Sequence, residues 1–193
     1  LAYLLALVIV GTTYSDKPVV QDVIAGFPAQ EAGMQAGDLI TRLDGERVYL
    51  SREIGLITTI RQGETLDVEY ERDGVIYETT LTPRMDEESG RYLLGFQGYA
   101  EYFQCSPLQV FQYGYYEVRY GLKATVKSLQ MLVQGKADKD EVSGPIGIAV
   151  LGDDVAEQTR PYGLWVMIVN LMNLAMLLSV NLGVLNLLPL PAL

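Results

Sequence analysis

The sequence predicts an α+β protein in which a domain of short strands and two helices lies between apolar segments suited to a membrane. Three observations support this class. Residues 162–193 contain no charged side chain, residues 65–71 and 75–81 alternate apolar and polar side chains, and residues 107–135 repeat apolar side chains at spacings of three and four. An uncharged run longer than the ~20 residues that cross a bilayer predicts a transmembrane helix. Alternation predicts strands, and the longer spacing predicts a helix.

Residues 1–10 are wholly apolar but too few to span a bilayer. We expect the end of a transmembrane helix here, and a buried core strand or helix is the alternative. The segment is not a signal peptide, because it lacks a positively charged leader and a clear cleavage site.

Turn and capping residues organise the next part of the chain. Residues 18–25 are rich in β-branched side chains, which predicts a strand. Pro28 suits the first turn of a short helix and Gly33 its C-terminal cap. Asp38 opens a further strand after a glycine turn, and Asp44-Gly45 is a second turn.

Helical spacing over residues 50–61 predicts a second helix, with Ser51 as its N-cap. Residues 65–71 and 75–81 form a predicted hairpin around Asp73-Gly74. Residues 91–98 predict a closing strand. Residues 26–45 resemble the core motif of PDZ domains of the bacterial protease type, which implies a circularly permuted PDZ domain, a β-sandwich or barrel with two helices, over residues 19–98.

A PDZ domain binds an extended peptide as an added strand beside a groove-lining helix, and the resemblance implies that residues 50–61 are this helix. Leu94-Gly95-Phe96 fits either a carboxylate-binding loop or an ordinary glycine in the closing strand, so the sequence assigns no ligand residue here.

Residues 107–135 predict one amphipathic helix, and its tyrosines suit a membrane interface where the ring is apolar and the hydroxyl is wet. We expect it to lie along a membrane surface, and a core helix of the soluble domain is the alternative. After a charged loop at residues 137–141, residues 143–158 predict a short membrane-associated segment that begins with the turn at Gly144-Pro145.

The segment at residues 162–193 contains a predicted break. Pro189 and Pro191 lack backbone N–H groups and disfavour helical geometry in the residues before them, so the helix should end near Leu187 and continue as extended chain. Extended backbone at membrane depth must be buried in protein or line a watery cavity. We therefore expect a site at this break, and we expect the amides of Asn181 and Asn186 to face the protein interior or a ligand.

The order Ser179, Asn181, Gly183, Asn186, and then the two prolines, resembles the signature of the site-2 protease family of intramembrane zinc metalloproteases. The resemblance implies an Asp zinc ligand directly after Leu193 and an upstream His-Glu-x-x-His helix. It also implies regulated intramembrane proteolysis of transmembrane proteins such as membrane-anchored regulators, in a multi-pass protein of the bacterial cell membrane with the PDZ domain on the extracytoplasmic side filtering or recognising substrates. The substrate-binding residues implied in this chain are Asn186, Asn181, Pro189 and Pro191.

The net charge and the lack of histidine exclude some functions for this chain. The formal net charge of −10 argues against a nucleic-acid partner, because no basic surface neutralises phosphates. The chain contains no His, so we expect it to bind no zinc and to be inactive by itself, as the middle and late part of a longer membrane protein. A non-catalytic PDZ-containing membrane adaptor is the alternative function. A soluble PDZ chaperone-protease is excluded, because a Ser-His-Asp set needs a histidine.

Overall fold

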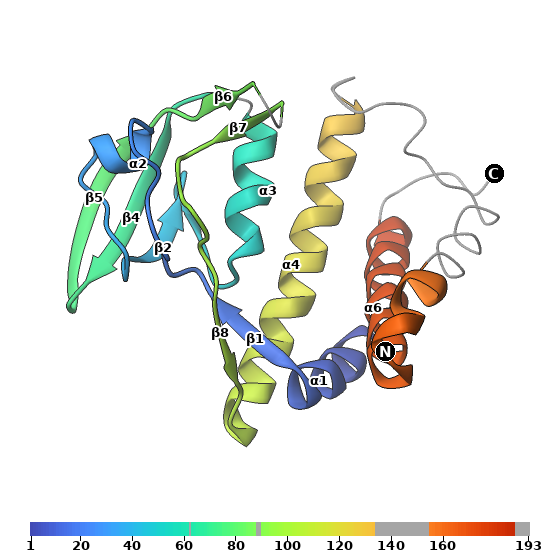
Figure 1. Ribbon diagram of the computed structural model, residues 1–193. Coiled ribbons are helices and arrows are strands. Elements are labelled where there is room, and N and C mark those ends of the chain that lie inside the picture. Colours follow the sequence, from blue (N-terminus) through green and yellow to red (C-terminus); the bar gives the residue numbers. More distant parts are fainter. Residues whose placement is uncertain (62, 88–89, 134–154, 188–193) are drawn as a thin grey trace. The chain divides into compact units, whose positions relative to one another are not determined.

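A computed structural model of the chain describes residues 1–61, 63–87, 90–133 and 155–187. The chain forms two compact units (Figure 1). Unit 1 comprises Leu1–Thr13 and Cys105–Leu193, and its described elements are helices. Unit 2, Tyr14–Gln104, combines strands with short helices. The mixed helix-and-strand content agrees with the predicted α+β class.

Unit 2 contains a four-stranded antiparallel sheet in the order β3-β2-β4-β5. Its strands are β2 (Leu39–Leu43), β3 (Glu46–Arg47), β4 (Leu66–Arg72) and β5 (Val75–Leu81). The predicted hairpin is confirmed, because β4 pairs with β5 from Leu66 opposite Leu81 to Arg72 opposite Val75. Asp73 and Gly74 both have positive φ, 53° and 80°, as a two-residue turn that matches the twist of a hairpin requires.

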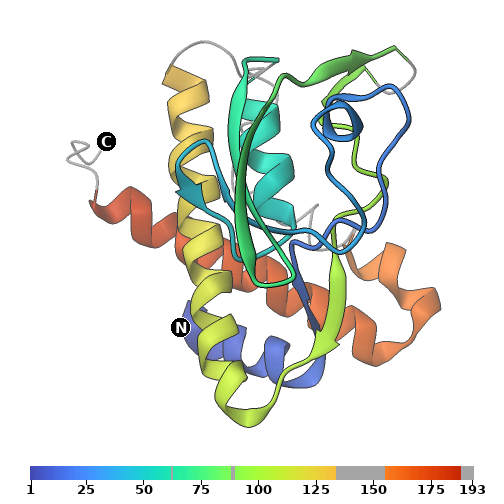
Figure 2. The same cartoon turned by 90° about the vertical axis from the view of Figure 1, so that its left-hand side faces the viewer.

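Two helices accompany this sheet, α2 (Pro28–Glu31) and α3 (Arg52–Arg61), and α2 begins at Pro28 as predicted. Helix α3 lies against the curved sheet in both views of the molecule (Figures 1 and 2), and it buries Ile54 and Ile57 in the core of the unit. The other buried core side chains are Val20, Ala29, Met34, Ile40, Leu43, Val48, Leu66, Val68, Tyr70, Leu81 and Leu94.

Two pairs of short strands complete unit 2. Strand β6 (Arg84–Asp86) pairs with β7 (Arg91–Leu93), and β1 (Tyr14–Lys17) pairs with β8 (Glu101–Gln104). The second pair places Tyr14 opposite Gln104, so the two ends of the unit are neighbours. Strand β1 is too short and polar to show a recognisable alternation in the sequence.

The prediction of a regular strand over residues 18–25 is wrong. This segment makes isolated bridges, Val19 with Leu39 and Val23 with Phe96. It changes partners part-way, since the Val20 N–H donates to the Asp38 carbonyl whereas the Gln21 N–H donates to the Gly98 carbonyl. A continuous ladder with one neighbour therefore does not form.

The described part of unit 1 consists mainly of α1 (Ala2–Thr12), α4 (Pro107–Val133) and α6 (Leu164–Leu187), which pack on one another. In both views α1 lies beside the first half of α4 (Figures 1 and 2). Ala6, Ile9 and Met176 form the buried cluster, with Val118 and Met172 packed against it. Residues 2–10 are thus helical, which agrees both with the end of a transmembrane helix and with a buried core helix, but not with a buried strand.

Glycines allow the helices of unit 1 to approach closely. A Cβ at Gly114 of α4 would lie 2.9 Å from Leu7 Cδ2 of α1. A Cβ at Gly121, two turns further along α4, would lie 3.4 Å from Val180 Cγ2 of α6. Small residues at helix contacts are typical of helices packed in membranes.

Within the described residues, α6 is the one helix long and apolar enough to cross a membrane, and α1 is shorter. Residues 155–159 are helical, and the 3-10 turn η2 (Arg160–Tyr162) precedes α6. The described part of α6 reaches Leu187. The predicted break at Pro189 and Pro191, and most of the segment at residues 143–158, lie outside the described residues.

Candidate functional site

A groove of about 450 Å³ lies in unit 2 between α3 and the segment that begins with β7. Ile54, Gly55, Thr58 and Thr59 contribute the α3 side. Its remaining lining residues are Gly90, Arg91, Tyr92, Leu93, Leu94, Gly95, Phe96 and Tyr99. A groove between a helix and a strand is the geometry in which an extended peptide is added as a further strand.

The lining of this groove is mostly apolar and aromatic. Of its described lining residues Arg91 alone carries a formal charge, although the whole chain has a net charge of −10. Phe96 and Tyr99 meet edge to face, with ring centroids 6.2 Å apart. An apolar floor beside one cation suits the apolar side chains of a peptide and an acidic group at its end.

Gly95 is required by the backbone of unit 2. Its φ is +94°, and a Cβ there would lie 2.2 Å from Phe27 Cβ. Its carbonyl accepts a hydrogen bond from the Ile24 N–H at 2.8 Å, and the Leu94 carbonyl accepts one from the Ala29 N–H at 2.9 Å. Positive φ and close packing therefore explain this glycine without a ligand, and they also end the predicted strand at residues 91–98 early, at Leu93.

The N-terminus of α3, the groove helix, is held by two buried carboxylates. Asp16 of β1 accepts a hydrogen bond from the Ser51 N–H at 2.6 Å. Glu53 accepts from the N–H groups of Tyr49 and Leu50 at 3.0 and 3.3 Å. Acidic groups at a helix N-terminus satisfy free N–H groups and interact favourably with the helix dipole. No local pattern in the sequence indicates this role of Asp16, because the contact joins residues far apart in the chain.

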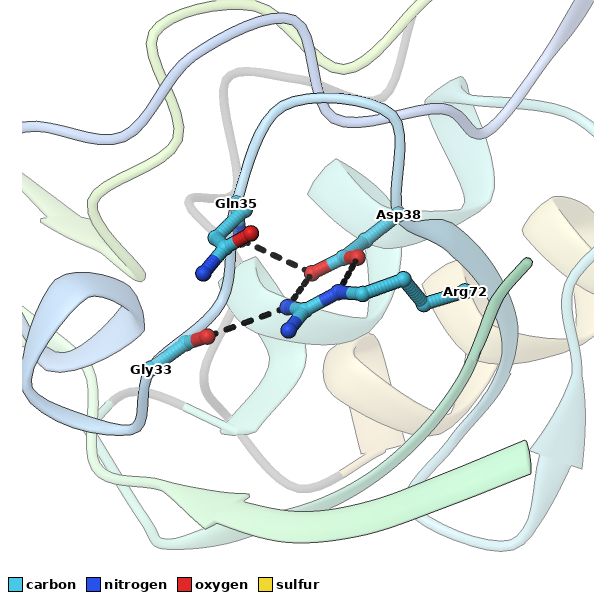
Figure 3. A network of polar contacts seen from close by, with 4 residues as sticks. All are labelled: Gly33, Gln35, Asp38 and Arg72. Atoms are coloured by element: carbon cyan, nitrogen blue, oxygen red, sulfur yellow. Dashed lines mark hydrogen bonds and ion pairs between the residues drawn. The ribbon is translucent and has the colours of Figure 1, made fainter. Parts of the chain in front are cut away.

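An ion pair fixes the turn between α2 and β2 (Figure 3). Arg72, at the end of β4, donates two hydrogen bonds to the Asp38 carboxylate, at 2.6 and 2.7 Å, and a third to the Gly33 carbonyl at 3.0 Å. Asp38 is fully buried and also accepts from the Gln35 N–H at 2.8 Å. The hydrogen bonds to Asp38 raise the pKa of Arg72 above its already high ordinary value.

The predicted substrate-binding residues lie in or beyond α6. Asn181 is half-buried, and its amide oxygen accepts a hydrogen bond from Thr125 of α4 at 2.5 Å. Asn186 is exposed near the end of the described helix. Pro189 and Pro191 lie outside the described residues. Thr125 belongs to no sequence motif, so the sequence alone does not indicate this contact.

The described residues of this chain do not form a zinc site by themselves. The chain contains no His. Within the described ranges no group of three or more Cys, Asp or Glu side chains is placed to hold a metal ion. Zinc in proteins is held mainly by His and Cys, and this chain contains one Cys and no His.

Solved structures similar to the chain include two PDZ domains of SdrC-like proteins. The domain from Listeria monocytogenes is 25% identical and covers 41% of this chain and 83% of its own, with a TM-score of 0.37. The domain from Listeria innocua is also 25% identical and covers 42% of this chain and 90% of its own, with a TM-score of 0.38.

Similar curated proteins are zinc metalloproteases. The zinc metalloprotease RasP of Geobacillus kaustophilus is 36% identical over 180 residues, which are 92% of this chain and 40% of that protein. The regulator of sigma-W protease RasP of Bacillus subtilis is 31% identical over 179 residues, 93% of this chain and 40% of that protein. The chain thus spans about two fifths of the length of these relatives.

The family comparison covers the whole chain. The model of peptidase family M50 matches residues 1–193, which include both units and the Asn-x-x-Pro-x-Pro segment. The resemblance inferred from the sequence is confirmed, and the chain belongs to peptidase family M50, the site-2 protease family.

Proposed function

We propose that this chain is part of a zinc-dependent intramembrane protease that cleaves membrane-spanning segments of other membrane proteins. The observation that carries the proposal is the match of the family model over residues 1–193 together with an uncharged helix that leads into the Asn186, Pro189 and Pro191 motif. Because the chain contains no His, the roles proposed for it are substrate holding and substrate selection.

We propose that α6 crosses the bilayer of a bacterial cell membrane, within a multi-pass protein. Its 24 residues correspond to about 36 Å of helix, enough for a hydrocarbon core of about 30 Å. Trp165, Ile168, Leu177 and Leu182 are among its exposed apolar side chains, and such side chains suit contact with lipid.

Helix α4 is proposed to associate with the membrane surface. One side of it packs on α1 and α6, and another side leaves large apolar residues exposed: Leu108, Phe111, Tyr115, Leu122 and Val126. An apolar stripe with tyrosines suits the boundary between headgroups and hydrocarbon. We extend the same proposal to residues 143–158.

Asn186 is proposed to hold the substrate. A helical substrate must unwind before its peptide bonds become accessible, and its freed backbone groups then need partners. An asparagine amide offers both donors and an acceptor for such a strand. Pro189 and Pro191 are proposed to keep the following segment extended, and Asn181 to assist in holding the strand.

The Asn186→Ala variant of the complete protein tests this role. We expect turnover of a transmembrane substrate to fall by about tenfold, since one or two hydrogen bonds to the substrate strand are lost. Zinc content, measured by metal analysis of the purified protein, should stay stoichiometric. Loss of zinc in this variant would show that Asn186 supports the metal centre and would contradict the assignment.

Unit 2 is proposed to be an extracytoplasmic PDZ domain that recognises or filters substrates. Its groove between α3 and β7 supports peptide binding. The name of the Bacillus subtilis relative, a regulator of sigma-W protease, supports membrane-anchored regulators as the class of substrate.

A bulky side chain in the groove tests this role. Thr59 is exposed and lines the groove, whereas Thr80 of β5 is exposed and does not line it. We expect Thr59→Trp to change the ratio of cleavage of intact to pre-trimmed substrates at least about threefold, because the groove is blocked. Thr80→Trp should leave this ratio unchanged. Equal cleavage ratios for both variants and the wild type would show that the groove does not take part in substrate selection.

A further inference from the structure

Helices α4 and α6 are joined by a side-chain hydrogen bond between Thr125 and Asn181. The Thr125 hydroxyl lies 2.5 Å from the Asn181 amide oxygen and 2.8 Å from the Gly121 carbonyl oxygen. The two side chains are partly buried. A carbonyl oxygen has two lone pairs, so the Gly121 carbonyl accepts both the backbone bond of the helix and the hydroxyl. The hydroxyl proton is shared between this carbonyl and the Asn181 amide oxygen, and the shorter of the two distances is to the amide.

The contact depends on the close approach of the two helices at Gly121. Val180, the residue before Asn181, is buried against this glycine, and a Cβ at position 121 would lie 3.7 Å from Val180 Cβ. Thr125 is one helical turn after Gly121, on the same face of α4. The glycine therefore brings the hydroxyl within reach of the amide.

This hydrogen bond determines which way the amide of Asn181 faces. An asparagine amide has one acceptor oxygen and one NH₂ group with two donors, on opposite sides of the same carbon. When the oxygen is held by Thr125 of α4, the NH₂ group is turned away from that hydroxyl. Backbone carbonyls of an unwound substrate strand are acceptors, so the orientation set by Thr125 presents the matching group.

We propose that Thr125 is a positioning residue for substrate binding, which orients the Asn181 amide so that its NH₂ group donates to a carbonyl of the substrate strand. This inference rests on the proposed substrate-holding role of the tail of α6. The Thr125 hydroxyl thereby gives α4 an indirect role in substrate binding.

Thr125→Val tests the proposal in the complete protein reconstituted in lipid, because valine has the shape of threonine without its hydroxyl. We expect KM for a transmembrane substrate to rise about fivefold, the factor contributed by one net hydrogen bond, with kcat within about twofold. Thr125→Ser retains a hydroxyl and should keep KM within about twofold of the wild type. A wild-type KM for Thr125→Val would overturn the proposal.

The Asn181→Ala variant separates positioning from a general structural effect. Asn181→Ala alone should raise KM by at least as much as Thr125→Val, and adding Thr125→Val to it should cause no further change, because the amide to be oriented is gone. A full additional fivefold loss in the double variant would overturn the positioning role. Wild-type KM for Asn181→Ala would show that the substrate-holding role of this residue itself fails.

A cross-link tests the helix contact without any activity measurement. The separation of 3.7 Å between the two Cβ positions lies within the range of disulfide bonds. We expect the Gly121→Cys/Val180→Cys pair, in a Cys105→Ser background, to form a disulfide under mild oxidation. The matched pair Leu122→Cys/Val180→Cys, with an exposed α4 position, should not. Failure of the first pair to cross-link would overturn the α4–α6 arrangement, whatever the outcome of the kinetic tests.

Discussion

Asp38 of unit 2 is a fully buried acidic residue whose carboxylate is satisfied by hydrogen bonds. Its carboxylate accepts hydrogen bonds from Arg72 and from the Gln35 N–H, so each oxygen has a partner. Arg72 also lies over the rings of Tyr70 and Tyr77, at 5.4 and 5.6 Å from their centroids. The guanidinium thus joins the end of β4 to the turn that leads into β2, through charge, hydrogen bonds and ring contact.

Removing the Asp38 carboxylate should destabilise unit 2. We expect Asp38→Ala to lower the free energy of unfolding by about 2 kcal/mol, because hydrogen bonds to a charged group are lost while Arg72, which is partly exposed, regains water. Urea denaturation of residues 14–104 measures this change. The matched control is Glu31→Ala, whose carboxylate pairs with Arg84 at 2.8 Å but is 54% exposed. It should cost less than about 1 kcal/mol, and equal losses in both variants would contradict the role of burial.

Residue contacts of this kind could not be predicted from the sequence. Turn chemistry predicted a strand beginning at Asp38 and the confirmed hairpin around Asp73-Gly74, because these signals are local. The pairing of Asp38 with Arg72 and that of Thr125 with Asn181 join residues 34 and 56 positions apart. Only the folded chain brings such residues together, so no local sequence pattern predicts these contacts.

Helix α4 illustrates the same limit for whole elements. Its spacing of apolar residues predicted a helix over residues 107–135, and the observed helix is Pro107–Val133. The large apolar residues of that pattern include Phe111, Tyr115 and Leu122, which are exposed. The side that packs on α1 and α6 carries Gly114 and Gly121 instead. Periodicity therefore identified the helix, but small residues determine its packing face, as is common between membrane helices.

Enlarging a glycine at this packing face should weaken unit 1. We expect Gly114→Val to lower the midpoint of thermal unfolding in detergent by several degrees, because its side chain would overlap Leu7 of α1 and push the helices apart. Gly183→Val in α6 is the control, since nothing lies within 4 Å of a Cβ at that position. If Gly183→Val proved equally destabilising, helix propensity rather than packing would be responsible.

At the scale of the whole molecule, the chain consists of two units with separate cores. One core joins α3 to the four-stranded sheet, and the other joins α1, α4 and α6. The resemblance to PDZ domains implied a domain over residues 19–98, between apolar segments that the sequence predicted to be membrane elements. The compact unit is wider, Tyr14–Gln104, because the short polar strands β1 and β8 pair at its ends.

Unit 2 should therefore fold alone. We expect residues 14–104, expressed separately, to protect the amides of β2 and β4 from hydrogen exchange to the same degree as in the complete protein, since the core that buries them lies within the unit. Hydrogen exchange read by mass spectrometry makes the comparison. Markedly faster exchange of these strands in the isolated unit would indicate that unit 1 contributes to their stability.

The ladder that sets Tyr14 opposite Gln104 has a consequence for how proteins of this kind can diversify. A module whose entry and exit are adjacent can be grafted into a host or removed from it without stretching the flanking chain. A domain of this kind can be duplicated, exchanged or lost during evolution while the helices on either side of it keep their connectivity. Substitutions that change the ligand of the inserted domain would then accumulate independently of the part of the protein into which it is inserted.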